Sequence, residues 1–311
     1  MPNENSQGLL TVRFKFLIGD KDSGWVQHSR GLEELLRLKG PESMKSLGSL
    51  IILESSRSSM IFAAIFSGRR TILSRAEWKV IPWTEHPERG DAMKLLIDIL
   101  ADCPELFVLR NETTAQLHGT GRYSTSLQLF KSKAFKVLED LKLWRDSNPN
   151  LLDQWIDAPT PADSPFCVRS DGQRSLFWNT ILNYKSVHLA NLTSLYYSIF
   201  ILVSQLIQGL ANGDEYQGLE EEVYSAGIIV CRSIDYHLDS VRVGADSLFI
   251  FFPMRMAFDA VGKSHAEVGT WLRNKLESIR SQSSGRWATA KYLLDLRSST
   301  ISVGTSIDEA S

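Results

Sequence analysis

Apolar side chains recur about every three to four residues through most of this chain, which is the spacing of one face of an α-helix. The clearest case runs from Leu127 to Trp144, where the helical period holds for about five turns. Similar spacing predicts helices across 32–38, 47–65, 93–100, 219–238 and 268–279. We therefore predict an all-α fold, a large multi-helix bundle that can divide into two packed helical sub-bundles.

Glycine and proline mark where these helices end. The first predicted helix stops at Gly40-Pro41, because glycine readily closes a helix and proline cannot continue one. Gly68 ends the second predicted helix. The apolar run 247–254 has the composition of a buried strand, but Pro253 and the helical spacing after it favour the start of a helix.

A proline-rich stretch, 158–165, is the best linker candidate, because each proline removes a backbone donor and biases the preceding residue away from helix. We expect an N-terminal segment with one strand or disorder (1–24), a first sub-bundle (25–157), a Pro-rich loop (158–172), a second sub-bundle (173–296) and a disordered tail (297–311). The second sub-bundle is predicted to begin with Leu176, Phe177, Ile181 and Leu182. The one predicted strand is 10–18, where apolar and polar residues alternate.

The stretch 189–210 is uncharged and long enough to cross a bilayer. Polar residues, among them Gln205 and Gln208, interrupt it, so we predict a buried helix of the bundle and no membrane contact. The N-terminus has no basic segment leading into a long apolar run, so we do not expect secretion.

Charge and cysteine content narrow the classes of function. Lys and Arg number 34 against 36 Asp and Glu, so no global positive field is available to bind a nucleic acid. The densest basic spot is only Arg69-Arg70 with Arg75 nearby. Three cysteines, 64 residues apart from one to the next, indicate reduced thiols rather than a disulfide framework. We therefore expect no direct DNA binding.

No local signature of catalysis or metal binding stands out. The dinucleotide and phosphate-loop motifs and the G-x-S-x-G nucleophile motif are absent from the sequence. His118 to Gly121 resembles an oxyanion-hole loop, but without a nucleophilic serine a turn is the better interpretation. Asp235, His237 and Asp239 alternate, so on a helix they point in different directions. We expect no enzyme activity, no cofactor and no metal.

A series of short motifs follows one another with helical segments between them. It consists of a helix with His28 and Gly31 that ends at Gly40-Pro41, an arginine helix around Arg57, the Ser74-Arg75 pair, Trp78, Pro82-Trp83, and later segments beginning at Cys231 and at Phe251, the latter containing Pro253. In this order the motifs resemble the regulatory domain, or middle homology region, of fungal six-cysteine zinc-cluster transcription factors. The resemblance spans roughly Trp25 to Phe258.

The resemblance implies an all-helical regulatory region in the nucleus, which controls a fungal metabolic gene cluster such as one for secondary metabolites. The chain departs from the family because its dispersed cysteines cannot form the zinc cluster. We therefore expect a regulator that acts through a protein partner, in a homo- or heterodimer, or through a small-molecule effector. If Arg57 is buried in its apolar helix, a carboxylate or carbonyl group must pair with it.

Other functions remain open at this point. The chain can be an accessory or decoy partner of a full-length zinc-cluster regulator, or a piece of a longer regulator. It can also be a helical enzyme that acts on an apolar small molecule. An enzyme would need a deep pocket with at least two titratable groups of shifted pKa, whereas purely apolar walls would exclude it.

Overall fold

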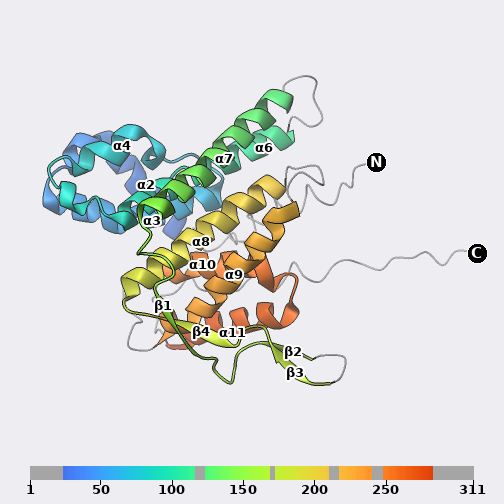
Figure 1. Cartoon of the computed structure of the whole chain (residues 1–311). Helices are drawn as coiled ribbons and strands as arrows, with labels where there is room; N and C mark the ends of the chain where they lie inside the picture. Colours follow the sequence, from blue (N-terminus) through green and yellow to red (C-terminus); the bar gives the residue numbers. More distant parts are fainter. Residues whose placement is uncertain (1–23, 116–122, 169–171, 210–216, 240–247, 283–311) are drawn as a thin grey trace, which may run out of the picture.

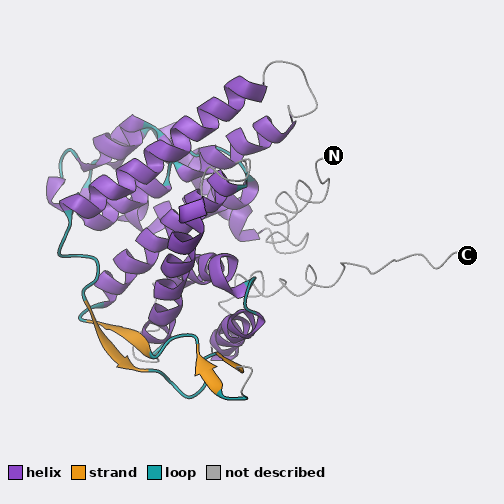
Figure 2. Cartoon of the chain, turned by 45° about the vertical axis from the view of Figure 1, so that its right-hand side comes forward, coloured by secondary structure: helices purple, strands orange, loops and turns teal. Residues whose placement is uncertain are grey.

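The computed structural model describes residues 24–115, 123–168, 172–209, 217–239 and 248–282. Helices dominate these residues, and short strands form an arm at one end (Figures 1 and 2). The α-helices are α2 (Gly24–Lys39), α3 (Leu47–Ser67), α4 (Ala76–Val80), α5 (Ala92–Leu100), α6 (Cys103–Ala115), α7 (Tyr123–Ser147), α8 (Val187–Gln208), α9 (Gln217–Leu238), α10 (Leu248–Ala257) and α11 (Ala266–Gln282). The prediction of an all-α fold is confirmed.

The helix ends follow the local chemistry of the sequence. Gly40 follows α2 with φ 75°, and Gly68 closes α3 in the left-handed conformation with φ 58°. A residue with a Cβ atom rarely adopts a positive φ, so glycine is the favoured residue at both helix ends. At the start of α5, the Asp91 carboxylate accepts a hydrogen bond of 2.8 Å from the backbone N–H of Lys94.

Helix α8 lies at the centre of the bundle and contacts α7, α9 and α10. It is long and apolar enough to cross a membrane, as is α3, but 72% of its most apolar window is buried inside the protein. The prediction that this uncharged helix is buried in the bundle is therefore confirmed. One of its buried polar side chains turns back on the helix, since the Ser198 hydroxyl donates to the Ser194 carbonyl at 2.5 Å.

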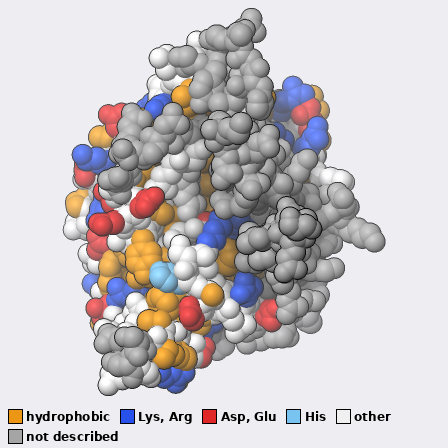
Figure 3. All heavy atoms as spheres, turned by 90° about the vertical axis from the view of Figure 1, so that its right-hand side faces the viewer, with side chains coloured by type: hydrophobic (Ala, Val, Ile, Leu, Met, Phe, Trp, Pro, Cys, Tyr) orange, Lys and Arg blue, Asp and Glu red, His pale blue; other side chains and the backbone are white. Residues whose placement is uncertain are grey.

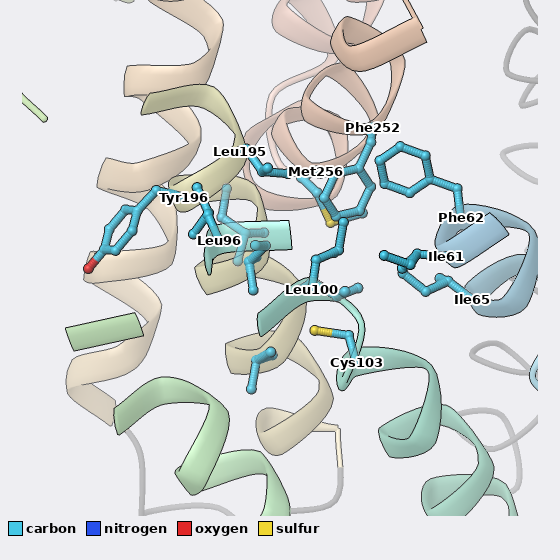
Figure 4. Close-up of a cluster of buried hydrophobic side chains, with 14 of the residues drawn as sticks. Ile61, Phe62, Ile65, Leu96, Leu100, Cys103, Leu195, Tyr196, Phe252 and Met256 are labelled. Atoms are coloured by element: carbon cyan, nitrogen blue, oxygen red, sulfur yellow. The ribbon is translucent and has the colours of Figure 1, made fainter. Parts of the chain in front are cut away.

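One continuous hydrophobic core joins the two halves of the chain, extending from Leu36 to Leu276. Figure 4 shows part of it, where side chains of α3, α5, α6, α8 and α10 meet: Ile61, Phe62, Ile65, Leu96, Leu100, Cys103, Leu195, Tyr196, Phe252 and Met256. Burial of each large apolar side chain stabilises the fold by about 1.5–3 kcal/mol. Helices from both predicted sub-bundles thus depend on the same core.

The second half begins with strands, which the sequence analysis missed. Strand β1 (Trp155–Pro159) pairs antiparallel with β4 (Thr180–Tyr184), and β2 (Phe166–Val168) pairs antiparallel with β3 (Arg174–Leu176). The two pairs are nested along the chain and form one arm (Figure 2). The prediction of a loop across 158–172 is therefore partly wrong, and the prediction that 176–182 begins a helical sub-bundle is wrong. The predicted strand at 10–18 and the tail from 297 lie outside the described residues.

The arm is held against α9 by packing and by one arginine. Leu182 and Tyr184 on β4 are buried, and the Tyr184 ring packs 5.2 Å from that of Tyr236 on α9. Arg232 on α9 donates from Nε to the Thr180 carbonyl at 2.7 Å. Pro159 is tolerated at the end of β1 because each sheet has only two strands, so every strand is an edge.

Helix α10 continues into a π-helix, η8 (Phe258–Gly262), in which the N–H of Lys263 donates to the Phe258 carbonyl at 3.0 Å. The helix begins at Leu248, so Pro253 lies inside it rather than at its start as predicted. Gly227 of α9 lets the π-helix approach closely, because a Cβ atom there would lie 2.7 Å from the Cβ of Ala260. Such π-helical turns are frequent at functional sites.

Candidate functional site

A cavity of about 290 Å³ lies between α6, α8, α10 and the π-helix. Its described walls combine apolar side chains with several charged and amide groups: Arg110, Leu202, Gln205, Leu206, Gln208, Gly209, Arg255, Met256, Asp259 and Lys263. The C-terminal end of α8 points toward the right-hand side of Figure 1, the face seen in Figure 3. Basic side chains lie near the centre of that face, beside hydrophobic ones. We call this cavity the junction pocket.

Positive charge predominates among the described walls of the junction pocket. Arg255 donates from Nε to the Asp259 carboxylate at 2.8 Å, and Lys263 pairs with the other oxygen of the same carboxylate. The residues lie four positions apart, which brings them onto one face across the π-helical turn. Burial alone would raise the pKa of Asp259, but the charges of Arg255 and Lys263 hold it below its ordinary value. Asp259 is therefore a buried, ionised carboxylate.

Among the described residues, Arg110 of α6 has no such carboxylate partner. It is 5% exposed, and its Nη2 atom donates to the Asn111 side chain at 3.3 Å. The described residues give its Nη1 atom no hydrogen-bond acceptor. Burial lowers the pKa of Arg110 to about 10, which leaves the guanidinium charged at neutral pH. A buried cation without a counter-ion costs free energy, so its presence calls for an explanation.

Two further donors share this condition. Arg255 is also 5% exposed, and its Nη1 atom has no acceptor among the residues that the structure describes. The same holds for the amide Nε2 of Gln208. Each of these atoms belongs to a residue that lines the junction pocket. The residues that line the pocket therefore carry three buried N–H groups without an acceptor.

The described walls of the pocket combine charged groups of shifted pKa with apolar side chains. Two wall residues, Arg110 and Asp259, are titratable groups with a shifted pKa. The walls are therefore not purely apolar, and the criterion that would exclude an enzyme is not met. However, no His, Cys, Ser, Thr, Tyr or Glu is among the described wall residues to act as nucleophile or base. Asp259 is a weak base, because two cations stabilise its ionised form.

The residue singled out by sequence, Arg57, forms a separate buried cluster. It is 1% exposed on α3, and its guanidinium pairs with Asp98 of α5, as expected for an arginine in an apolar helix. Lys94 pairs with the other Asp98 oxygen at 2.6 Å. The Trp83 ring lies close to both cations, with its centroid 4.7 Å from the Arg57 guanidinium carbon and 4.8 Å from Lys94 Nζ.

Most other motif residues lie around this cluster rather than around the junction pocket. The turn at Gly40-Pro41, helix α4 and the 3-10 helix η3 (Ile81–Trp83) are neighbours, and Trp78, Pro82 and Trp83 are buried there. His28 and Gly31 are exposed on α2, and Arg75 is exposed at the start of α4. Pro253 lies on α10, two residues before Arg255 of the pocket. Most of the motif residues therefore belong to the packing around the Arg57 cluster, and only Pro253 lies on a helix that lines the junction pocket.

The sequence analysis missed the residues of the junction pocket. Gln205 and Gln208 interrupt an apolar helix, and this pattern could have indicated a polar site, because polar groups on a buried helix need partners. A second signal is the spacing of Arg255, Asp259 and Lys263, at intervals of four residues. Nothing in the local sequence links them to Arg110.

The acidic and histidine residues considered for a metal have other partners. Asp235 pairs with Lys275 at 2.6 Å, and His237 Nε2 lies 3.0 Å from the Ser194 hydroxyl. Within the described part of the chain, no group of three or more His, Cys, Asp or Glu side chains is placed to hold a metal ion.

Comparison with known proteins gave no match to a protein-family model, to a curated protein or to a solved structure.

Proposed function

We propose that this protein is a regulator that binds a small effector in the junction pocket and acts on gene expression through a protein partner. The observation that carries the proposal is the set of three buried donors without acceptors around one cavity. The described walls present hydrogen-bond donors and an ionised carboxylate that pairs with two cations, but no nucleophile. Binding without chemical conversion therefore fits this pocket best.

The position of the pocket supports a regulatory role. Arg110 comes from the first half of the chain, whereas Gln208 and Arg255 come from the second half. A ligand that bridges these side chains stabilises one arrangement of α6 against α8 and α10 over others. Such differential binding is the requirement for a ligand to shift a conformational equilibrium.

The resemblance to fungal zinc-cluster regulators supports the rest of the proposal. It suggests a nuclear protein that controls genes of a metabolic cluster, and the near-zero net charge suggests that a partner, not this chain, contacts DNA. We expect the effector to change how this chain engages that partner.

Transcript sequencing tests the proposal. The gene is disrupted in its source organism and restored with the wild type, with Arg110→Met, or with Arg145→Met as a matched control outside the pocket. Arg145 pairs with Asp153 at 3.0 Å, and both side chains are about half exposed. We expect disruption to change a limited set of transcripts, which the wild type and Arg145→Met restore and Arg110→Met does not. Unchanged transcripts after disruption would refute the regulatory role.

An accessory partner of a larger regulator is the second candidate. It is favoured by exposed apolar side chains on the helix pair α2 and α3: Leu35, Leu38, Leu47, Ile51 and Ile52. Exposed apolar residues that gather on neighbouring elements are typical of protein contacts. Leu38 is 73% exposed, so Leu38→Glu should reduce co-purification of the larger regulator with this chain without unfolding it. Leu143→Glu on α7 is the control, and equal effects of both changes would argue against this surface.

A further inference from the structure

We infer that the ligand of the junction pocket is a small organic anion, whose carboxylate or phosphate group lies between Arg110 and Arg255. The inference rests on the proposed function in one respect, namely that the pocket holds a ligand. It goes further by assigning the chemical class of that ligand from the charge, the donors and the size of the pocket.

The charges of the described pocket walls favour a negative partner. Three cations, Arg110, Arg255 and Lys263, face one carboxylate, Asp259, among the described pocket walls. Helix α8 ends at Gln208 beside the pocket, and the negative end of its dipole contributes only about half an elementary charge. The described walls therefore carry an excess of positive charge in a partly buried setting, which favours an anion over a cation as ligand.

Among the described residues that line the pocket, the buried nitrogen atoms without an acceptor are all donors, and the Asp259 oxygen without a hydrogen bond has Lys263 as its ion-pair partner. The Nη1 atoms of Arg110 and Arg255 and the Nε2 atom of Gln208 each need an acceptor. Guanidinium groups match the oxygen geometry of carboxylates and phosphates, and hydrogen bonds between charged partners are about twice as strong as neutral ones. Arg255 already uses its Nε atom on Asp259, so the ligand completes its coordination instead of displacing a partner.

The walls limit the rest of the ligand. A volume of about 290 Å³ is near the lower end for small-molecule sites, roughly 300–1,000 Å³. Leu202, Leu206 and Met256 supply apolar surface on the side of α8 and α10. An organic acid or phosphate ester with a short carbon body suits a cavity of this volume and lining.

Calorimetric titration and thermal unfolding of the full chain test the inference. The probes are succinate, glycerol 3-phosphate and inorganic phosphate, and the neutral analogues are succinamide and glycerol. We expect at least one anion to bind and to raise the Tm, with affinity that falls as salt is added. The neutral analogues should bind at least about tenfold more weakly. Succinate against glycerol 3-phosphate separates a carboxylate from a phosphate ligand.

Variants connect binding to the pocket. Arg110→Met removes an unpaired buried cation and keeps a similar apolar stem, so it should weaken anion binding at least about tenfold while leaving the ligand-free Tm unchanged or higher. Gln208→Leu should weaken binding less, because it removes a neutral donor. Arg145→Met is the matched control and should bind as the wild type does.

The outcomes separate the inference from the proposed function. Equal binding of anions and neutral analogues overturns the anion assignment but leaves a ligand-binding regulator in place. No Tm increase with any of the three anions, together with a lower Tm for Arg110→Met, overturns the inference and makes Arg110 a structural residue. The transcript experiment then decides the regulatory role independently.

Discussion

Replacing Arg57 by methionine tests whether a buried ion pair fixes α3 against α5. The substitution keeps most of the apolar stem and removes the guanidinium that pairs with Asp98 and lies over the Trp83 ring. It leaves Asp98 buried in contact with a single remaining cation, Lys94, at 2.6 Å. The change therefore alters charge pairing with little change in side-chain volume.

The expected cost follows from these contacts. Removing one partner of a buried ion pair lowers stability by about 3–5 kcal/mol. Lys94 still balances part of the Asp98 charge, which places the cost near the lower end. The cation–π contact at a desolvated site contributes about 2 kcal/mol, and the estimate for the broken ion pair already includes part of this loss. Arg57→Met should thus lower the free energy of unfolding by about 3 kcal/mol.

Urea unfolding followed by circular dichroism measures this free energy, with the slope of the transition as a check that both proteins unfold to the same extent. Arg145→Met is the control, since a surface pair contributes only about 0–1 kcal/mol. The double variant Arg57→Met with Asp98→Asn should recover part of the loss, because the uncompensated carboxylate is gone. An unchanged or higher stability for Arg57→Met would refute the reasoning.

Three further predictions follow from other contacts. The folded pKa of Asp259 lies below its unfolded value, so its contribution to stability is present above about pH 4 and is lost as pH falls through the folded pKa. Asp259→Asn should therefore make the free energy of unfolding less dependent on pH in the acid range, and an identical acid profile would contradict this. Gly269→Ala should destabilise by about 1–3 kcal/mol, because the new Cβ would lie 2.6 Å from the Gly262 carbonyl oxygen, whereas Gly218→Ala has open space and should be neutral or stabilising in thermal unfolding. A thiol reagent should label Cys167 first in the native protein, since burial raises the pKa of the other two thiols; equal rates for all three would argue against their burial.

The sequence predicted helices well because their ends and faces are local properties. Gly40 and Gly68 sit where the helical period stops, and both adopt positive φ in the structure. The β-arm was missed because its strands have only three to five residues, too short for alternation to be distinguished from helical spacing. Leu176 and Leu182 fit either period, and only the pairing of β2 with β3 and of β1 with β4 decides between them.

The sites were harder to predict, because they depend on contacts between distant residues. A partner for buried Arg57 was expected from its apolar surroundings, but Asp98 lies 41 positions away and had no local mark. The junction pocket brings Arg110 to Arg255 through the packing of α6, α8 and α10. Their missing acceptors become visible only when every buried donor is accounted for in three dimensions.

The continuous core has a consequence for how the chain can be divided. Because α8 buries its surface against helices from both halves, a fragment that ends before β1 would expose the faces of α5, α6 and α7 that α8 covers. Separate expression of either half should therefore give aggregated protein, whereas a nick in the β-arm between β2 and β3 should leave the two pieces associated. The arm is the place to insert a tag or a cleavage site. The helical bundle folds and unfolds as one cooperative unit.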